Sequence, residues 1–221
     1  MKIKTVILPI DGILFTTQQL RQNLWKQILD DHGITHDTLF FIRTIDVGQP
    51  EKDHVYFQYY KQKPYIDSVE TALLEQIKAA SSQDLLKPGS LDFLNFLKRQ
   101  GIQIALISAH SQEYMDVITA KTETKSFFST MVSGDEVIEG LPEPHLILKA
   151  MHQLNATLED TLVIEQSRHG LHGAYLANVQ TIFLEDIFNK HDHEDLIKYS
   201  TRQAKTLAEV ETMIQEINHT Q

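Results

Sequence analysis

The sequence of 221 residues contains no cysteine. Disulfides, thiolate catalysis, cysteine-ligated zinc and iron–sulfur clusters are therefore excluded together. The absence agrees with a reducing compartment, and we expect a cytoplasmic protein. A long hydrophobic run is also lacking, because the apolar stretch near the N-terminus ends at Pro9 and Asp11. That is too early for a signal peptide or a membrane span.

Positive charge is scarce as well. The chain has 20 Lys and Arg against 30 Asp and Glu, which gives a formal net charge of −10 with His neutral. Such a surface repels phosphate backbones and anionic lipid, so we expect neither nucleic-acid binding nor a polybasic membrane anchor. The composition indicates neither a protein partner nor an oligomeric state.

Short apolar runs predict the strands of a parallel sheet. They are apolar on both faces, as expected for strands that helices cover on both sides. The runs are residues 3–8, 102–107, 161–164 and 179–184, with a shorter one at 130–132. We expect the first run to be central, with the second and third on either side of it.

Helical patterns fill the intervals between the later runs. Pro88-Gly89-Ser90 predicts a turn and a helix start, and Gly101 ends that helix. Further helices are predicted at residues 111–121, 144–155, 168–177 and after a capping box of Thr206 and Glu209. From residue 86 onward, alternating helices and strands predict a doubly wound α/β fold with a parallel sheet.

The segment after the first run has a different pattern. It carries helical patterns at residues 18–31, 53–62 and 65–80 and no convincing strand. We therefore predict an α/β core of residues 1–14 and 86–221, into which a helical cap of residues 15–85 is inserted.

Polar motifs follow three of the predicted strands. In open α/β sheets, ligands bind at the carboxyl ends of the strands. The segments found there are Pro9-Ile10-Asp11-Gly12-Ile13-Leu14, Ser108-Ala109-His110 and Glu165-Gln166-Ser167, with Gly140-Leu141-Pro142-Glu143-Pro144-His145 between the second and third.

With these motifs in this order, the chain resembles the haloacid dehalogenase superfamily, in its β-phosphoglucomutase and phosphoglycolate phosphatase-like branch. The resemblance covers nearly the whole chain and includes Gly134-Asp135-Glu136-Val137. It implies a Mg²⁺ cofactor and a small phosphorylated metabolite as ligand. In the family, the first aspartate of the first motif attacks phosphorus and binds Mg²⁺, and the second is the general acid and base.

Three positions depart from the family's pattern. The nucleophile position is Pro9, the lysine of the third motif is Leu141, and the aspartate of the fourth motif is Gln166. Phosphoryl transfer depends on positioning, a metal and positive charge where negative charge develops. The sequence therefore predicts an inactive or strongly impaired member that binds Mg²⁺ weakly or not at all. The alternative is a Mg²⁺-dependent phosphatase or sugar-phosphate mutase with a rearranged site.

The remaining site residues each have two interpretations. Asp11 matches the acid and base, or is a capping or loop acid left from ancestry. Ser108 holds an anion with backbone N–H groups near Gly12, or caps the next helix. Glu165 forms a weak metal site with Asp11, or is a buried, hydrogen-bonded acid. Arg43 is the cap residue that we expect to meet an anion.

Histidines offer a further alternative. His110, His145 and His169 all fall on loops of the predicted crevice, where together they would form a transition-metal site. The chain contains 11 His, however, so chance clustering is easy.

Overall fold

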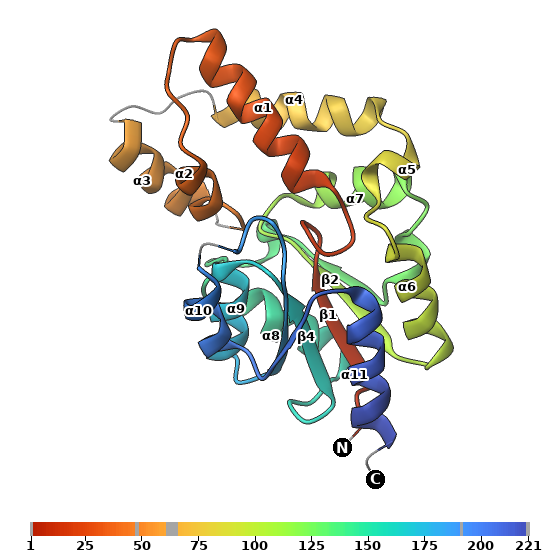
Figure 1. Ribbon diagram of the computed structural model, residues 1–221. Coiled ribbons are helices and arrows are strands. Elements are labelled where there is room, and N and C mark those ends of the chain that lie inside the picture. The colour runs from red at the N-terminus through yellow and green to blue at the C-terminus, as the bar shows by residue number, and fades with distance from the viewer. Residues whose placement is uncertain (1, 47–48, 61–65, 191, 220–221) are drawn as a thin grey trace.

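A six-stranded parallel sheet forms the centre of the computed structural model, which describes residues 2–46, 49–60, 66–190 and 192–219 (Figure 1). Its strands are β1 (Thr5–Pro9), β2 (Gln103–Ile107), β3 (Thr130–Val132), β4 (Thr161–Glu165), β5 (Gln180–Leu184) and β6 (Arg202–Ala204). They lie in the order β3-β2-β1-β4-β5-β6. Leu8 of β1 pairs with Leu106, and Val6 pairs with Leu162. The predicted central position of β1 is therefore confirmed.

Helices cover both faces of this sheet, as a doubly wound fold requires. They are α6 (Ser90–Arg99), α7 (Gln112–Lys121), α8 (His145–Leu154), α9 (Arg168–Leu176), α10 (His193–Leu196) and α11 (Leu207–His219). Alternate residues of β1 point to opposite faces. Val6 and Leu8 join the apolar cluster under α6 and α11, whereas Ile7 joins the cluster under α8.

Two strand predictions differ from the structure. β1 begins at Thr5 rather than residue 3 and extends to Pro9, whose missing N–H is harmless at a strand end. The sixth strand, β6, was missed because it is short and polar, and only Ala204 in it is buried. It pairs with β5 alone at the edge of the sheet, where no apolar run is needed.

The segment after β1 is helical in its described part. It contains α1 (Thr17–Asp31), α2 (Thr38–Arg43), α3 (Gln49–Tyr60), α4 (Ile66–Ala79) and α5 (Ser82–Leu85). The helix predicted at 53–62 begins earlier, and Gln62 and Tyr65 lie outside the described residues. These helices lie beyond the carboxyl end of β1, where α4 packs against both α1 and α7 (Figure 1). The division into core and cap at residues 15 and 85 remains our proposal.

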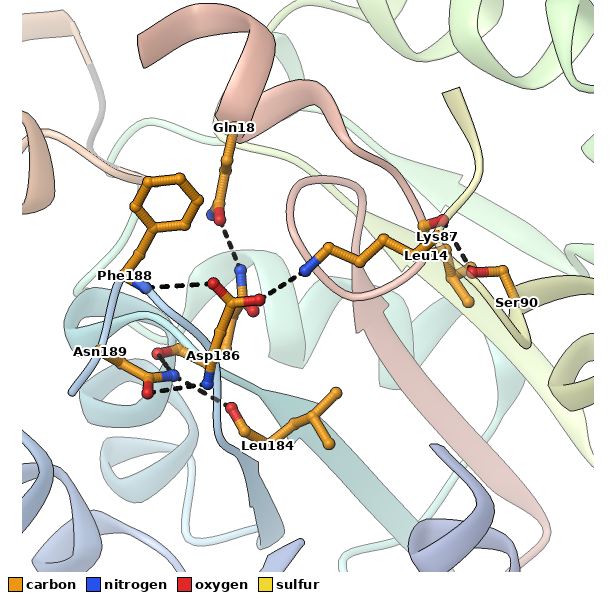
Figure 2. Close-up of polar contacts among 9 residues, drawn as sticks. Leu14, Gln18, Lys87, Ser90, Leu184, Asp186, Phe188 and Asn189 are labelled. Atoms are coloured by element: carbon orange, nitrogen blue, oxygen red, sulfur yellow. Dashed lines mark hydrogen bonds and ion pairs between the residues drawn. The ribbon is translucent and has the colours of Figure 1, made fainter. Parts of the chain in front are cut away.

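Two short links join this segment to the sheet, and they lie side by side. The Thr16 N–H donates to the Leu85 carbonyl at 2.9 Å, and the Lys87 N–H donates to the Leu14 carbonyl at 2.8 Å. The Ser90 hydroxyl also donates to the Leu14 carbonyl at 2.8 Å (Figure 2). The chain thus leaves and re-enters the sheet layer at one place. Among the described helices, none combines the length and apolar character that crossing a bilayer requires.

Candidate active site

Asp11 lies just beyond the carboxyl end of β1 and is only 1% exposed. Its Oδ1 accepts hydrogen bonds from the Tyr114 hydroxyl at 2.7 Å and from the Thr17 hydroxyl. Its Oδ2 lies 3.4 Å from His110 Nε2 and 3.9 Å from Arg21 Nη1. Core elements and helix α1 of the inserted segment therefore converge on one carboxylate.

The ionisation of Asp11 follows from these neighbours. Burial opposes the charged form most strongly, but the hydrogen bond from His110 and the charge of Arg21 outweigh it. Together with Thr17 they hold the pKa of Asp11 well below its usual range. The group is therefore a carboxylate at neutral pH and carries no proton to donate. A role in acid–base chemistry stays a prediction.

Gly12 and Gln166 fill the space beside Asp11. Gly12 has a φ of +86°, and a Cβ atom there would lie 1.5 Å from Gln166 Nε2. That amide nitrogen donates to Gln18 Oε1 of α1 at 2.6 Å, as Figure 2 shows beside the labelled Gln18. The backbone carbonyl of Gln166 accepts from Asn189 Nδ2 at 3.2 Å. Both glutamines are buried.

Little room remains around this amide pair. The cavity that Gln18 and Gln166 line together with Phe188 has a volume of about 20 Å³. A water molecule needs at least ~10–15 Å³ of such space, so about one water fits.

Glu165 ends β4 and is fully buried. Its Oε2 accepts from the Gln166 N–H at 2.8 Å, the Ser167 N–H at 3.1 Å and the Ser167 hydroxyl at 3.3 Å. Burial, followed by the negative charge of Asp46, raises its pKa to about 8, and the three hydrogen bonds offset part of this. The geometry thus corresponds to the buried, hydrogen-bonded acid of the two interpretations.

We expect the stability of the protein to fall as the pH rises from about 5 to about 8, because Glu165 keeps a proton in the folded state that the unfolded state has already lost. Glu165→Gln should flatten this dependence. Urea denaturation across the pH range measures it, with the exposed Glu159→Gln as control. An unchanged slope in Glu165→Gln would show that another group carries the dependence.

Ser108 and Leu141 occupy the second and third motif positions. The Ser108 hydroxyl oxygen accepts from the His110 N–H at 2.9 Å, whereas Ser111 caps α7 by accepting from the Tyr114 N–H at 3.3 Å. The helix-cap interpretation of Ser108 is therefore wrong, and its anion-binding role stays a prediction. Leu141 is buried, and its Cδ2 lies 2.7 Å from where a Cβ of Gly173 on α9 would be.

The other cations near the motifs are engaged elsewhere. Lys149 Nζ donates to the Glu136 carbonyl at 2.9 Å, so it does not replace the lysine missing at Leu141. Lys87 forms a 2.6 Å ion pair with Asp186 in the loop after β5, a contact that sequence reasoning missed (Figure 2). Arg43 donates to the Tyr59 hydroxyl, and its guanidinium lies 5.7 Å from the centre of that ring.

The three histidines do not converge. His110 lies beside Asp11, His145 is 3.8 Å from Glu139, and His169 Nδ1 is 3.2 Å from the Ile45 carbonyl. Over the described residues, no group of three His, Cys, Asp or Glu side chains is placed to hold a metal ion.

A larger hollow lies away from these motifs. It has a volume of about 690 Å³ and is lined by charged side chains of both signs: Glu185, Lys190, Asp192, His193, Glu194, Asp195 and Lys205. Ion pairs engage part of this lining, including His193 with Glu185 at 3.3 Å and Arg168 with Asp192 at 3.1 Å. The mixed charge of this lining selects no class of ligand.

Mg²⁺ requires near-octahedral oxygen ligands, usually including one or two carboxylates. Pro9 offers no side-chain oxygen, and Gln166 turns its amide nitrogen toward Gln18. Hydrogen-bond donors and cations already surround the Asp11 oxygens. The donor set present at the crevice does not fit Mg²⁺.

Helix α1 supplies the residues that sequence reasoning missed. Thr17, Gln18 and Arg21 are buried polar residues on a helix assigned to the cap. Gln18 and Arg21 share a face with the apolar Trp25, since residues three and four apart are neighbours on a helix. The sequence did contain a signal for these residues, because polar side chains lie at helical spacing from apolar ones on this segment. Asp46, which lies near Glu165 with a φ of +57°, gave no such signal.

Comparison with known proteins identifies the family. Residues 6–184 match the haloacid dehalogenase-like hydrolases. The chain is 26% identical over 183 residues to the phosphorylated carbohydrates phosphatase of Thermotoga maritima, covering 82% of this chain and 84% of that protein.

Solved structures share the fold. β-Phosphoglucomutase from Clostridium difficile superposes with a TM-score of 0.78 at 17% identity, over 97% of this chain and 98% of that one. CbbY from Rhodobacter sphaeroides, solved in complex with phosphate, gives 0.76 at 22% identity over 94% and 96%. The chain therefore belongs to the haloacid dehalogenase-like hydrolase family.

Proposed function

We propose that this chain is a haloacid dehalogenase-like protein that no longer transfers phosphoryl groups. The observation that carries the proposal is Pro9 at the carboxyl end of β1. Proline has neither a nucleophilic atom nor a side-chain oxygen for a metal. Loss of the nucleophile alone costs on the order of 10⁶ in turnover in a well-studied hydrolase.

The surrounding residues support the same conclusion. The lysine and the second carboxylate are replaced by Leu141 and Gln166, so positive charge and metal ligands are lost with the nucleophile. The space beside Asp11 is taken by the side chains of Gln166 and Gln18. Relatives include phosphatases of phosphorylated carbohydrates, and any ligand retained here is a small phosphorylated metabolite or an inorganic anion, held weakly near Ser108.

The alternative, a phosphatase or mutase with a rearranged site, draws on one observation: Asp11 is retained at the position of the acid and base. Its environment argues against that role, because a carboxyl group whose pKa lies far below neutrality does not protonate a leaving group. The alternative also requires another nucleophile near Asp11, and the Thr17 hydroxyl already donates to it.

We expect the purified chain to release no phosphate from an aryl phosphate above background, with or without Mg²⁺. Calorimetry should show no Mg²⁺ binding at micromolar concentrations and at most weak binding of inorganic phosphate. A metal-dependent turnover that co-purifies with the chain and disappears in Asp11→Ala would overturn the proposal. So would micromolar Mg²⁺ affinity that is lost in Glu165→Ala, since this would indicate a rebuilt metal centre.

A further inference from the structure

The pairing of Asp11 with Arg21 is a buried contact between charges on two parts of the chain. Asp11 follows β1, whereas Arg21 lies on α1, and their side chains are 1% and 6% exposed. The Arg21 guanidinium also lies 5.6 Å from the ring centre of Tyr114, whose hydroxyl donates to Asp11. A buried carboxylate requires a compensating charge or donors, because removal from water disfavours the ionised form.

In catalytic relatives that follow the family's motifs, cations in the crevice offset the carboxylates. Here the donor set does not fit Mg²⁺, and Leu141 and Lys149 bring no positive charge to the crevice. Arg21 brings a permanent positive charge to 3.9 Å from the Asp11 carboxylate. Together with the His110 ring, whose Nε2 lies 3.4 Å from Asp11 Oδ2, Arg21 therefore compensates Asp11 from within the chain.

The same face of α1 makes a second contact with the core. Gln18, three residues before Arg21, accepts from Gln166 Nε2 at 2.6 Å, and Thr17 donates to Asp11. Elsewhere the inserted segment packs on the core through the rings of Phe41 and Phe188, whose centres are 5.7 Å apart. Separating α1 from the sheet would break these contacts in one step.

We propose that Arg21 is a built-in cation that takes the place of the metal ion and lysine as the counter-charge of Asp11, and thereby holds α1 closed on the core without a ligand. The closed position of the cap is then its resting state, and the chain's own residues maintain it. The inference concerns charge compensation and cap position, and it does not depend on the absence of turnover.

Amide hydrogen exchange of the full chain tests it. The amide protons on Gln166 Nε2, which binds Gln18 Oε1 across the contact between the core and α1, report separation of α1 from the sheet. Arg21→Met removes the charge and keeps the apolar stem. We expect these protons to exchange about 10-fold or more faster in this variant, since coupled charges interact strongly. Arg43→Met, on an exposed arginine paired with Tyr59, is the matched control and should leave them unchanged.

The double variant Asp11→Asn/Arg21→Met distinguishes charge from packing. If the charge pair holds the cap, removing both partners restores most of the protection that Arg21→Met loses. Additive effects of the two changes, or unchanged exchange in Arg21→Met, would overturn the proposal. Should Arg21→Met fail to fold, a folded double variant supports the proposal and an unfolded one overturns it. Turnover by the wild-type chain would overturn the proposed function but would not alter these exchange results.

Discussion

Pro9→Asp alone is expected to leave the hydrolysis of phosphate esters at background. The new carboxylate would face the crevice without the lysine that Leu141 replaces and without the metal ligand that Gln166 replaces. The triple variant Pro9→Asp/Leu141→Lys/Gln166→Asp should exceed the single variant by about 100-fold or more, because one missing electrostatic donor costs roughly 10²–10³ and catalytic groups act as a unit. Release of phosphate from an aryl phosphate with Mg²⁺ measures both.

The control for this series replaces Leu141→Lys by Leu141→Met in the triple background. Methionine matches leucine in volume and adds no charge, so it reports the effect of repacking against Gly173 alone. We expect it to leave turnover near the level of Pro9→Asp. Equal rates for Pro9→Asp and the triple variant would show that the replaced lysine and aspartate positions are not what limits this crevice.

Gly12→Ala is expected to lower the free energy of unfolding by about 4 kcal/mol, the combined effect of left-handed strain, overpacking and a lost buried amide bond. Gly12 has a φ of +86°, and its new Cβ would lie 1.5 Å from Gln166 Nε2 and 2.6 Å from Gln18 Oε1. The amide pair between α1 and the core must therefore move or break. Urea denaturation followed by circular dichroism measures the loss.

Gly89→Ala is the matched comparison, because Gly89 has nearly the same φ, +82°, and a Cβ there meets no atom within 4 Å. Its free energy of unfolding should fall by only about 1–2 kcal/mol, which is the cost of the left-handed conformation for a residue with a Cβ. The difference between the two variants isolates the close packing of Gln166 over Gly12. Equal losses would mean that the amide pair shifts at little cost.

The sheet could be predicted because its central strands are recognisable in the sequence. Val6, Leu8 and Leu106 are buried between two helical layers, so their segments read as continuous apolar runs. The edge strand β6 exposes Arg202 and Gln203 and leaves no such run. Short helices were missed for a similar reason: α2 has six residues and α5 has four, too few for a helical period to repeat.

Only some residues of the candidate active site could be predicted from the sequence. Asp11, Ser108 and Glu165 follow strands, so the rule that parallel strands end at one edge brings them together. Arg21 and Tyr114 lie inside helices, and their approach to Asp11 depends on how α1 and α7 pack on the sheet. Local sequence does not encode how these two helices are oriented on the sheet. The polar side chains on the buried face of α1 were visible, but their partner was not.

Pro9 has a consequence for the chain during its synthesis. Thr5 of β1 pairs with Gln103 and Thr161, so β1 leaves the ribosome before either neighbouring strand exists. At about 5–20 residues per second, it waits for several seconds as an unpaired apolar strand. Segments of this kind template aggregation, and a proline without an N–H limits intermolecular pairing at the end where it sits. A proline at this position is therefore expected to limit such pairing of the nascent chain.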